Sequence, residues 1–153
     1  MRVVFANRTP RPAFEGEGCC QVSFDELLAC ADIITLHCAA APETENIIDA
    51  RAIAAMKDGV RIVNTARGTL IDEQALRDAL DCGKVAGAAL DVIAVEPMRP
   101  ECPLLGAPNT VITPHIAWAT VEARTRLIAQ IAENVRAFVQ GRSRNVVNPA
   151  VLG

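Results

Sequence analysis

Three side chains of complementary chemistry stand between positions 67 and 115 of the sequence: Arg67, Glu96 and His115. A guanidinium stays charged and holds a carboxylate through two parallel hydrogen bonds. An imidazole exchanges a proton near neutral pH, and a carboxylate on its far nitrogen fixes the tautomer and stabilises the imidazolium. The three groups would suit reduction of a 2-oxoacid, with Arg67 holding the carboxylate, His115 as general acid and base, and Glu96 orienting the imidazole.

Each of these side chains follows a segment that we predict to be a strand. Short runs rich in β-branched residues alternate with helical patterns, and the expected strands cover residues 2–6, 32–37, 60–64, 85–92 and 110–113. Such apolar runs are typical of parallel strands buried on both faces. The β-α-β order predicts an α/β fold, a doubly wound parallel sheet of the Rossmann type, whose strands end at one ligand-binding edge. The three side chains would then share one cleft.

Helix boundaries are marked by local signals. The segment from Ser23 to Glu26 forms a capping box, and Asp49 and Asp72 repeat the N-terminal cap. Gly59 and Gly83 stand where helices are expected to stop.

A last helix is predicted to start at Thr120 and to end near Gly141. An apolar stripe at spacings of four, four and three supports it, formed by Leu127, Ile131, Val135 and Phe138. We expect residues 144–149 to form a short strand and tail.

The composition narrows the classes of function. The 153 residues suffice for one buried core, and 51% are hydrophobic but 3% aromatic. A net charge of -3 without a basic run argues against nucleic-acid and anionic-membrane partners. The sequence has no spanning stretch of about 18 to 20 apolar residues and no leader pattern, which predicts a cytoplasmic protein. The six cysteines include no C-x-x-C pair, so we expect free thiols and no metal site.

Four ordered motifs give the chain a family resemblance. It resembles the D-isomer-specific 2-hydroxyacid dehydrogenases over nearly its whole length, through residues 64–68, residues 87–92, Glu96-Pro97 and Pro114-His115-Ile116. The resemblance implies an oxidoreductase that transfers a hydride between NAD(P)(H) and a small 2-hydroxyacid or 2-oxoacid, with Arg67, Glu96 and His115 as the catalytic set. Residues 114–118 and 144–148 look most like bacterial glycerate dehydrogenases, also called hydroxypyruvate reductases, so glycerate/hydroxypyruvate or glyoxylate is the expected substrate.

The resemblance also implies cofactor contacts, at Cys38, Thr65, Ala66, Asp91, His115 and Trp118. From its residue type alone, Cys38 is expected to be a small buried apolar residue rather than a ligand contact, and His37 is expected to be structural.

The residues after the first predicted strand, Asn7, Arg8 and Thr9, include no acid to bind the ribose hydroxyls of NAD. Because Arg8 could pair with a 2′-phosphate, we expect NADP(H) or dual use slightly more than NAD alone. Two alternatives are that Arg8 stacks on adenine or that it faces solvent.

One family feature is absent from this sequence, because no G-x-G-x-x-G loop occurs. We therefore expect an incomplete sheet that lacks the glycine-loop strand and helix. Residues 1–118 would form the C-terminal portion of the cofactor domain, and residues 119–153 a helix and tail returning toward a substrate domain. The complete enzyme would be a homodimer, and this chain alone would be inactive. Two alternatives are a phosphite- or formate-type dehydrogenase of the same fold and a non-catalytic, NAD-sensing interaction protein.

Overall fold

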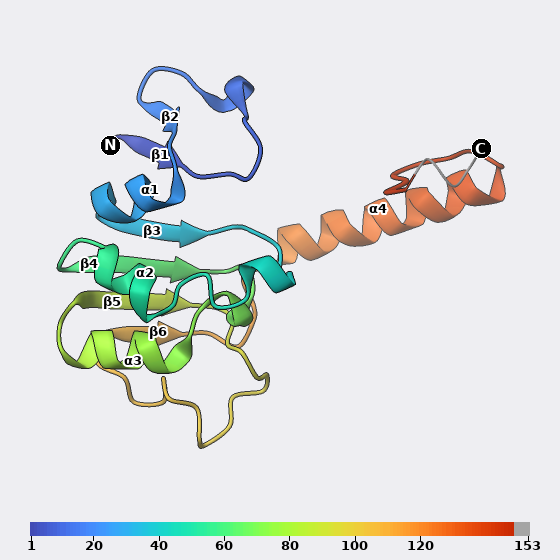
Figure 1. The fold of residues 1–153 in the computed structure, drawn as a ribbon. Coiled ribbons are helices and arrows are strands. Elements are labelled where there is room, and N and C mark those ends of the chain that lie inside the picture. Colours follow the sequence, from blue (N-terminus) through green and yellow to red (C-terminus); the bar gives the residue numbers. More distant parts are fainter. Residues whose placement is uncertain (149–153) are drawn as a thin grey trace. The chain divides into compact units, whose positions relative to one another are not determined.

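The structure is a computed structural model that describes residues 1–148. The chain forms two compact units, Met1–His115 and the residues from Ile116 onward. The strands and three of the helices belong to the first unit, and the long helix α4 belongs to the second (Figure 1).

Two parallel sheets make up the first unit. One pairs β1 (Val3–Phe5) with β2 (Cys19–Gln21). The other has the order β3-β4-β5-β6, formed by Ile33–Leu36, Val60–Asn64, Val85–Leu90 and Thr110–Ile112. The predicted parallel α/β class is confirmed. Strand β2 was not predicted, because it has three residues and is defined by its pairing with β1 rather than by an apolar run of its own.

Strands β1 and β3 each have an open edge. Among the described residues, β1 is hydrogen-bonded to β2 alone and β3 to β4 alone. The break between the two sheets falls where the doubly wound order places the strand that carries the glycine loop.

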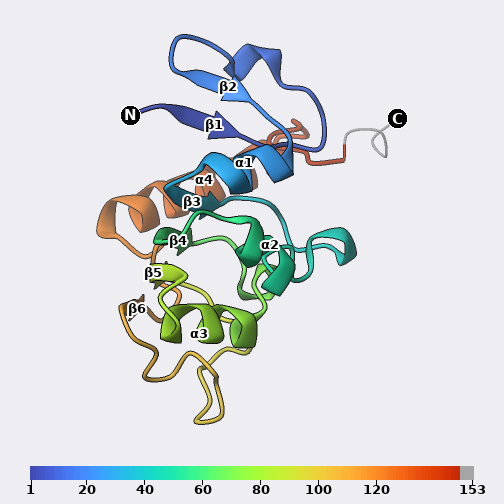
Figure 2. The same ribbon diagram turned by 60° about the vertical axis from the view of Figure 1, so that its left-hand side comes forward.

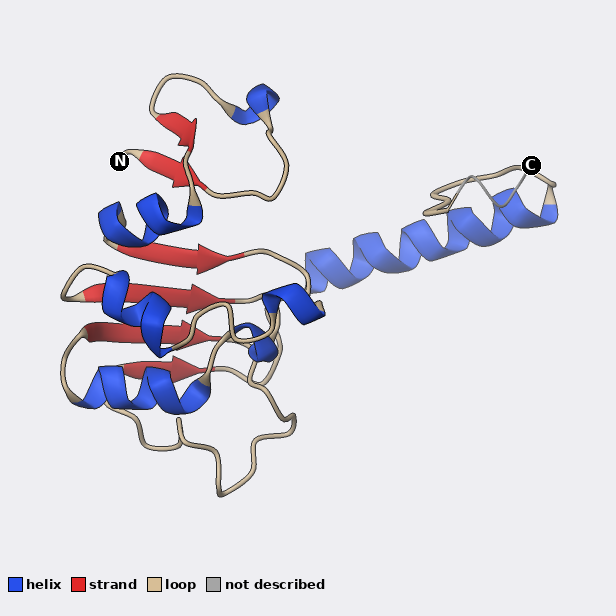
Figure 3. Ribbon diagram, viewed as in Figure 1, coloured by secondary structure: helices blue, strands red, loops and turns tan. Residues whose placement is uncertain are grey.

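The helices of the first unit lie on one face of the four-stranded sheet (Figures 1, 2 and 3). They are α1 (Phe24–Cys30), α2 (Ala50–Ala55) and α3 (Glu73–Asp81). Strand side chains under the helices, such as Ile34 and Ile62, are 3% and 0% exposed, whereas Ile33 and Val111 are 58% and 65% exposed. The expected burial of both faces is therefore wrong for this unit, because no helix among its described residues covers the opposite face.

The predicted caps are confirmed. The Ser23 side chain accepts a hydrogen bond from the Glu26 N–H while the Glu26 carboxylate accepts one from the Ser23 N–H. Asp49 caps α2 through the Ala52 N–H, and Asp72 caps α3 through two backbone N–H groups.

The glycines after these helices adopt the left-handed conformation that ends a helix. Gly83, with φ of 78°, directly follows Cys82, the C-cap residue of α3. Gly59 also has φ of 78°, but it does not end a helix as predicted: α2 ends at Ala55, and Gly59 lies in the turn that leads into β4.

The second unit contains α4 (Val121–Val139), which Thr120 caps and which ends just before Gly141, as predicted. All four side chains of the predicted apolar stripe are more than half exposed. The predicted strand in the tail is wrong for residues 144–148, and Pro149 lies outside the described residues. The tail binds α4 through side chains instead, since Arg144 donates to the Asn134 and Gln130 side chains.

Across the described residues, no helix is long and apolar enough to cross a membrane. The same residues contain no group of three His, Cys, Asp or Glu side chains suited to a metal ion. The six cysteines are free thiols.

Candidate active site

The turn after β4 is held by a buried amide. Asn64, the last residue of β4, is 0% exposed. Its Nδ2 donates to the Arg67 carbonyl at 2.8 Å, and its Oδ1 accepts from the Ala66 N–H at 3.0 Å. These two bonds fix the course of the backbone from residue 64 to residue 67. Arg67 is therefore presented at the end of the strand with its side chain exposed, where Nη1 donates to the Ala66 carbonyl at 2.6 Å.

The next residue brings this turn against the loop that follows β5. A Cβ atom added to Gly68 would lie 1.9 Å from the carbonyl carbon of Ile93 and 2.0 Å from its oxygen. The two backbones are thus in direct contact, and glycine is the residue that permits it. Since Ile93 stands three residues before Glu96, this contact sets the position of the Glu96 loop relative to the Arg67 turn.

The ends of β5 and β6 are tied together by a buried carboxylate. Asp91 is 5% exposed, and its Oδ1 accepts a hydrogen bond of 2.5 Å from the Thr113 hydroxyl. The His115 N–H donates to the carbonyls of Asp91 and Thr113, both at 2.9 Å. His115 has a φ of 54°, a conformation that a side chain other than glycine rarely adopts. The surrounding hydrogen bonds hold His115 in this strained conformation, as is often found at functional sites.

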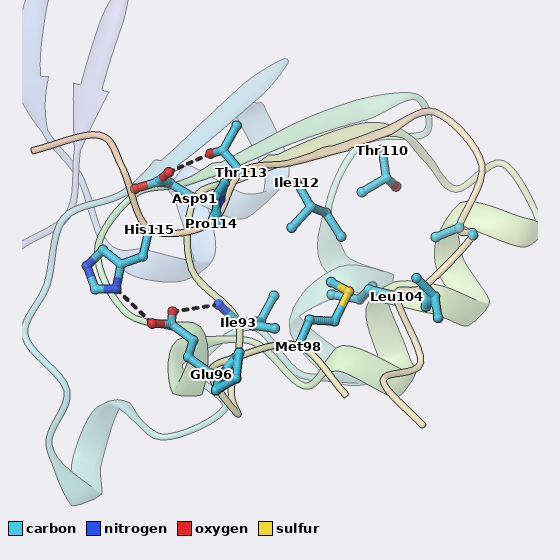
Figure 4. A pocket seen from close by; sticks show the side chains of 14 residues that line it. Asp91, Ile93, Glu96, Met98, Leu104, Thr110, Ile112, Thr113, Pro114 and His115 are labelled. Atoms are coloured by element: carbon cyan, nitrogen blue, oxygen red, sulfur yellow. Dashed lines mark hydrogen bonds and ion pairs between the residues drawn. The ribbon is translucent and has the colours of Figure 1, made fainter. Parts of the chain in front are cut away.

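Glu96 and His115 form the hydrogen-bonded pair that the sequence predicted (Figure 4). His115 Nδ1 and Glu96 Oε2 are 2.8 Å apart. The hydrogen bond with His115 is the main reason why the pKa of Glu96 lies below its ordinary value. The carboxylate is therefore ionised at neutral pH, so Nδ1–H donates to it. Nε2 lies on the opposite side of the ring, away from Glu96.

The loop that carries Glu96 also closes one end of a pocket of about 720 Å³. Glu96 and His115 lie at that end, and Met98, Leu104 and Ile112 provide apolar wall (Figure 4). The other oxygen of Glu96, Oε1, accepts from the Ile93 N–H at 3.3 Å. The carboxylate is thus held between a backbone amide and an imidazole, beside an apolar hollow.

The loop that follows β1 is held by hydrogen bonds to the neighbouring strand β2. Gln21 of β2 holds this loop, since its Nε2 donates to the Asn7 carbonyl at 3.1 Å and its Oε1 accepts from the Arg11 N–H at 2.8 Å. The Asn7 side chain donates to the Thr9 carbonyl at 2.8 Å. A pocket of about 410 Å³ opens here, lined by Phe5, Ala6, Asn7, Arg11 and Phe14.

Sequence reasoning found Arg8 but missed Arg11 and Phe14. The signal was present, because a second arginine follows Arg8 at a spacing of three. Arg8 itself is exposed.

The remaining predicted contacts are distributed over both units. Thr65 is exposed after β4, and Ala66 is half-buried. Cys38 is exposed after β3, so the expectation that it is a small buried residue is wrong. Trp118 is 56% exposed and belongs to the second unit. Within the first unit, Glu96 is therefore in direct contact with His115. The loop that carries Glu96 contacts the Arg67 turn through the backbone of Gly68.

These features agree with comparisons to known proteins. Residues 1–117 match the family model described as "D-isomer specific 2-hydroxyacid dehydrogenase, NAD binding domain". The chain belongs to this family. It is 51% identical over 148 residues to a hydroxypyruvate reductase of Blautia hydrogenotrophica, covering 97% of this chain and 46% of that protein. The chain thus spans about half the length of this relative.

Two solved structures have the same fold. A glyoxylate reductase from Paecilomyes thermophila superposes with a TM-score of 0.87 at 40% identity, over 98% of this chain and 46% of that one. A D-lactate dehydrogenase from Aquifex aeolicus, complexed with NAD and lactic acid, superposes with a TM-score of 0.83 at 35% identity, over 92% and 47%.

Proposed function

We propose that this chain supplies the catalytic residues of an NAD(P)-dependent oxidoreductase that interconverts a small 2-oxoacid and its 2-hydroxyacid. Hydroxypyruvate/glycerate and glyoxylate are the favoured substrates. The observation that carries the proposal is the 2.8 Å hydrogen bond between His115 and Glu96, held beside the turn that carries Arg67. The names of the hydroxypyruvate reductase and glyoxylate reductase relatives support the choice of substrate.

Each of the three side chains has a separate task in the reaction. Arg67 binds the substrate carboxylate and places the carbonyl, which its charge also polarises. His115 donates a proton from Nε2 to the carbonyl oxygen during reduction and accepts one during oxidation. Glu96 keeps Nδ1 protonated and stabilises the imidazolium form. The nicotinamide, when bound, supplies or accepts the hydride.

The described residues fit the adenosine end of such a cofactor. The pocket beyond β1 is lined by two aromatic residues, Phe5 and Phe14, and by Arg11, and Arg8 is nearby in sequence. No acid follows β1 to repel a 2′-phosphate, and an arginine pairs well with one. We therefore propose that NADP(H) is accepted, either in preference to NAD(H) or beside it.

The domain organisation that we propose assigns residues 1–118 to the cofactor domain. The exposed apolar side chains of α4 support a packing role for residues 119–153 against a substrate domain. We propose that the complete enzyme is a cytoplasmic homodimer.

The test uses this chain in two forms, by itself and in a chimaera. In the chimaera, the chain replaces the matching segment of the Blautia hydrogenotrophica reductase, to which it is 51% identical. Hydroxypyruvate, glyoxylate, pyruvate, formate and phosphite are assayed with both nicotinamide cofactors. We expect the chimaera to reduce hydroxypyruvate or glyoxylate.

Two substitutions test whether His115 and Arg67 of this chain carry out the reaction. His115→Ala should lower kcat by about 100-fold or more, as expected for a general acid and base, while the variant still binds the cofactor. Arg67→Ala should raise KM and lower kcat together, because it binds the substrate and also places the carbonyl. Near-normal kinetics in both variants would contradict the proposal, and activity on formate or phosphite alone would contradict the substrate class.

A further inference from the structure

Glu73 makes a contact that its place in the sequence does not explain. It is the first residue of α3, and its Oε1 accepts a hydrogen bond from the Ala94 N–H at 2.7 Å. Ala94 belongs to the loop after β5, two residues before Glu96. The side chain of Glu73 therefore extends from the helix to the loop that carries Glu96, the hydrogen-bond partner of His115.

The N-terminus of α3 does not need Glu73 as a cap. Asp72 already accepts hydrogen bonds from the N–H groups of Gln74 and Ala75, at 3.0 Å each. Oε2 of Glu73 is within 3.8 Å of the Cys102 sulfur, a second contact outside the helix. Both oxygens of Glu73 are thus directed at segments that follow β5.

The Glu96 loop is fixed by two carboxylates and one glycine. The Ile93 N–H is bound by Glu96 itself, and the next N–H, of Ala94, is bound by Glu73. On its other side the loop is in backbone contact with Gly68. If Glu73 is removed, the Ala94 N–H loses its partner and the loop keeps fewer constraints between Ile93 and Glu96.

The Arg67 turn has a different support. Its hydrogen bonds come from the buried Asn64 side chain, and Glu73 makes none with it. Loosening the Glu96 loop should therefore disturb proton transfer more than binding of the substrate carboxylate.

We propose that Glu73 is a positioning residue for the Glu96–His115 pair. The proposal rests on the function proposed above. Glu73 holds the Glu96 loop through Ala94, so that the Glu96 carboxylate stays within hydrogen-bonding distance of His115 Nδ1. A catalytic group displaced by about 1 Å can lose on the order of 100-fold in rate.

The test compares three variants of the chimaera, by kcat, KM for hydroxypyruvate and thermal midpoint. Glu73→Ala removes the acceptor, and Glu73→Gln keeps an oxygen for the Ala94 N–H. Asp49→Ala is the matched control, because Asp49 accepts a hydrogen bond of the same length, 2.7 Å, from the Ala52 N–H at the start of α2, a helix other than the one that begins with Glu73.

We expect Glu73→Ala to lower kcat by about 10-fold or more, with KM within about twofold of the parent. Glu73→Gln should restore kcat to within about threefold of the parent. Asp49→Ala should lower the thermal midpoint as Glu73→Ala does but keep the parent kcat. Hydrogen exchange adds a readout that is independent of turnover, since the Ala94 amide should exchange faster in Glu73→Ala than in Glu73→Gln.

Three results would overturn the positioning role: parent kcat in Glu73→Ala, no recovery in Glu73→Gln, or an equal loss of kcat in Asp49→Ala. A parent chimaera that reduces no 2-oxoacid would instead contradict the proposed function. An active parent with an unaffected Glu73→Ala variant would contradict the positioning role alone.

Discussion

Replacing Gly68 with alanine tests whether the contact between the Arg67 turn and the Glu96 loop sets the geometry of catalysis. The added Cβ would lie 1.9 Å from the carbonyl carbon of Ile93 and 2.4 Å from the Ala94 nitrogen. Unbonded carbon atoms are normally about 3.5 Å apart or more. Because all the nearest atoms belong to the backbone, no side-chain rotation relieves the overlap. The turn and the loop must therefore separate by more than about 1 Å.

The size of this displacement gives the expected loss of activity. A misplacement of about 1 Å between catalytic groups can cost on the order of 100-fold in rate. We expect Gly68→Ala to lower kcat by about this factor, and KM to rise because Arg67 is adjacent to the new methyl group. Overpacking of a tight site also costs about 1 to 3 kcal/mol of stability.

The assay is steady-state reduction of hydroxypyruvate by the chimaera, with the thermal midpoint measured in parallel. Gly16→Ala is the matched control, since a Cβ there meets nothing within 4 Å and the glycine does not have a positive φ. It should keep the kcat of the parent. Activity of Gly68→Ala within about threefold of the parent would refute the argument, and so would an equal loss in Gly16→Ala.

Three further predictions concern stability, cofactor choice and the chain in isolation. Because the hydrogen bond with His115 holds the folded pKa of Glu96 below 4.5, its stabilising contribution is present above that pH and is lost as the pH falls through the lowered pKa. The difference in unfolding free energy between the parent and Glu96→Gln should therefore shrink below pH 4.5. It should stay under about 1 kcal/mol, because the paired side chains are well exposed; a difference that grows on acidification would contradict this. Arg8→Asp should lower kcat/KM for NADPH by about 10-fold or more relative to NADH, and a parent that strongly prefers NADH would contradict the assignment of a 2′-phosphate contact. The 153-residue chain alone should self-associate and reduce no 2-oxoacid, because β1 and β3 have open edges and Ile33 and Val111 are exposed. Light scattering and the reductase assay check this, and an active monomer would contradict it.

The parts of the fold that the sequence predicted depend on local chemistry. Ser23, Asp49 and Asp72 cap their helices because each side chain reaches an N–H two or three residues ahead. The strands of the larger sheet were predicted because their apolar runs are continuous. Strand β2 was not predicted, because it forms through its pairing with β1. The structure of residues 144–148 was not predicted either, because side-chain hydrogen bonds to α4 determine it.

The same distinction applies to the site. In a doubly wound parallel sheet the strands end at one ligand-binding edge, and this predicted that His115 and Glu96 would lie together. The topology of the sheet does not predict how closely two loops approach each other at that edge. In this chain Gly68 decides that distance, and a glycine has no side chain whose type or spacing would reveal the contact.

Glu73 was overlooked for a different reason. An acidic residue in the first turn of a helix is already favoured by the helix dipole. The helix dipole thus explains an acidic residue at position 73 completely. A hydrogen bond from Glu73 to a distant loop adds no further pattern to the sequence. The structure separates the two explanations, because Asp72 caps the helix while Glu73 binds the Ala94 N–H of another segment. For that reason the Glu73→Gln variant is the most informative one: it removes the charge that favours the helix start but keeps the oxygen that holds the loop.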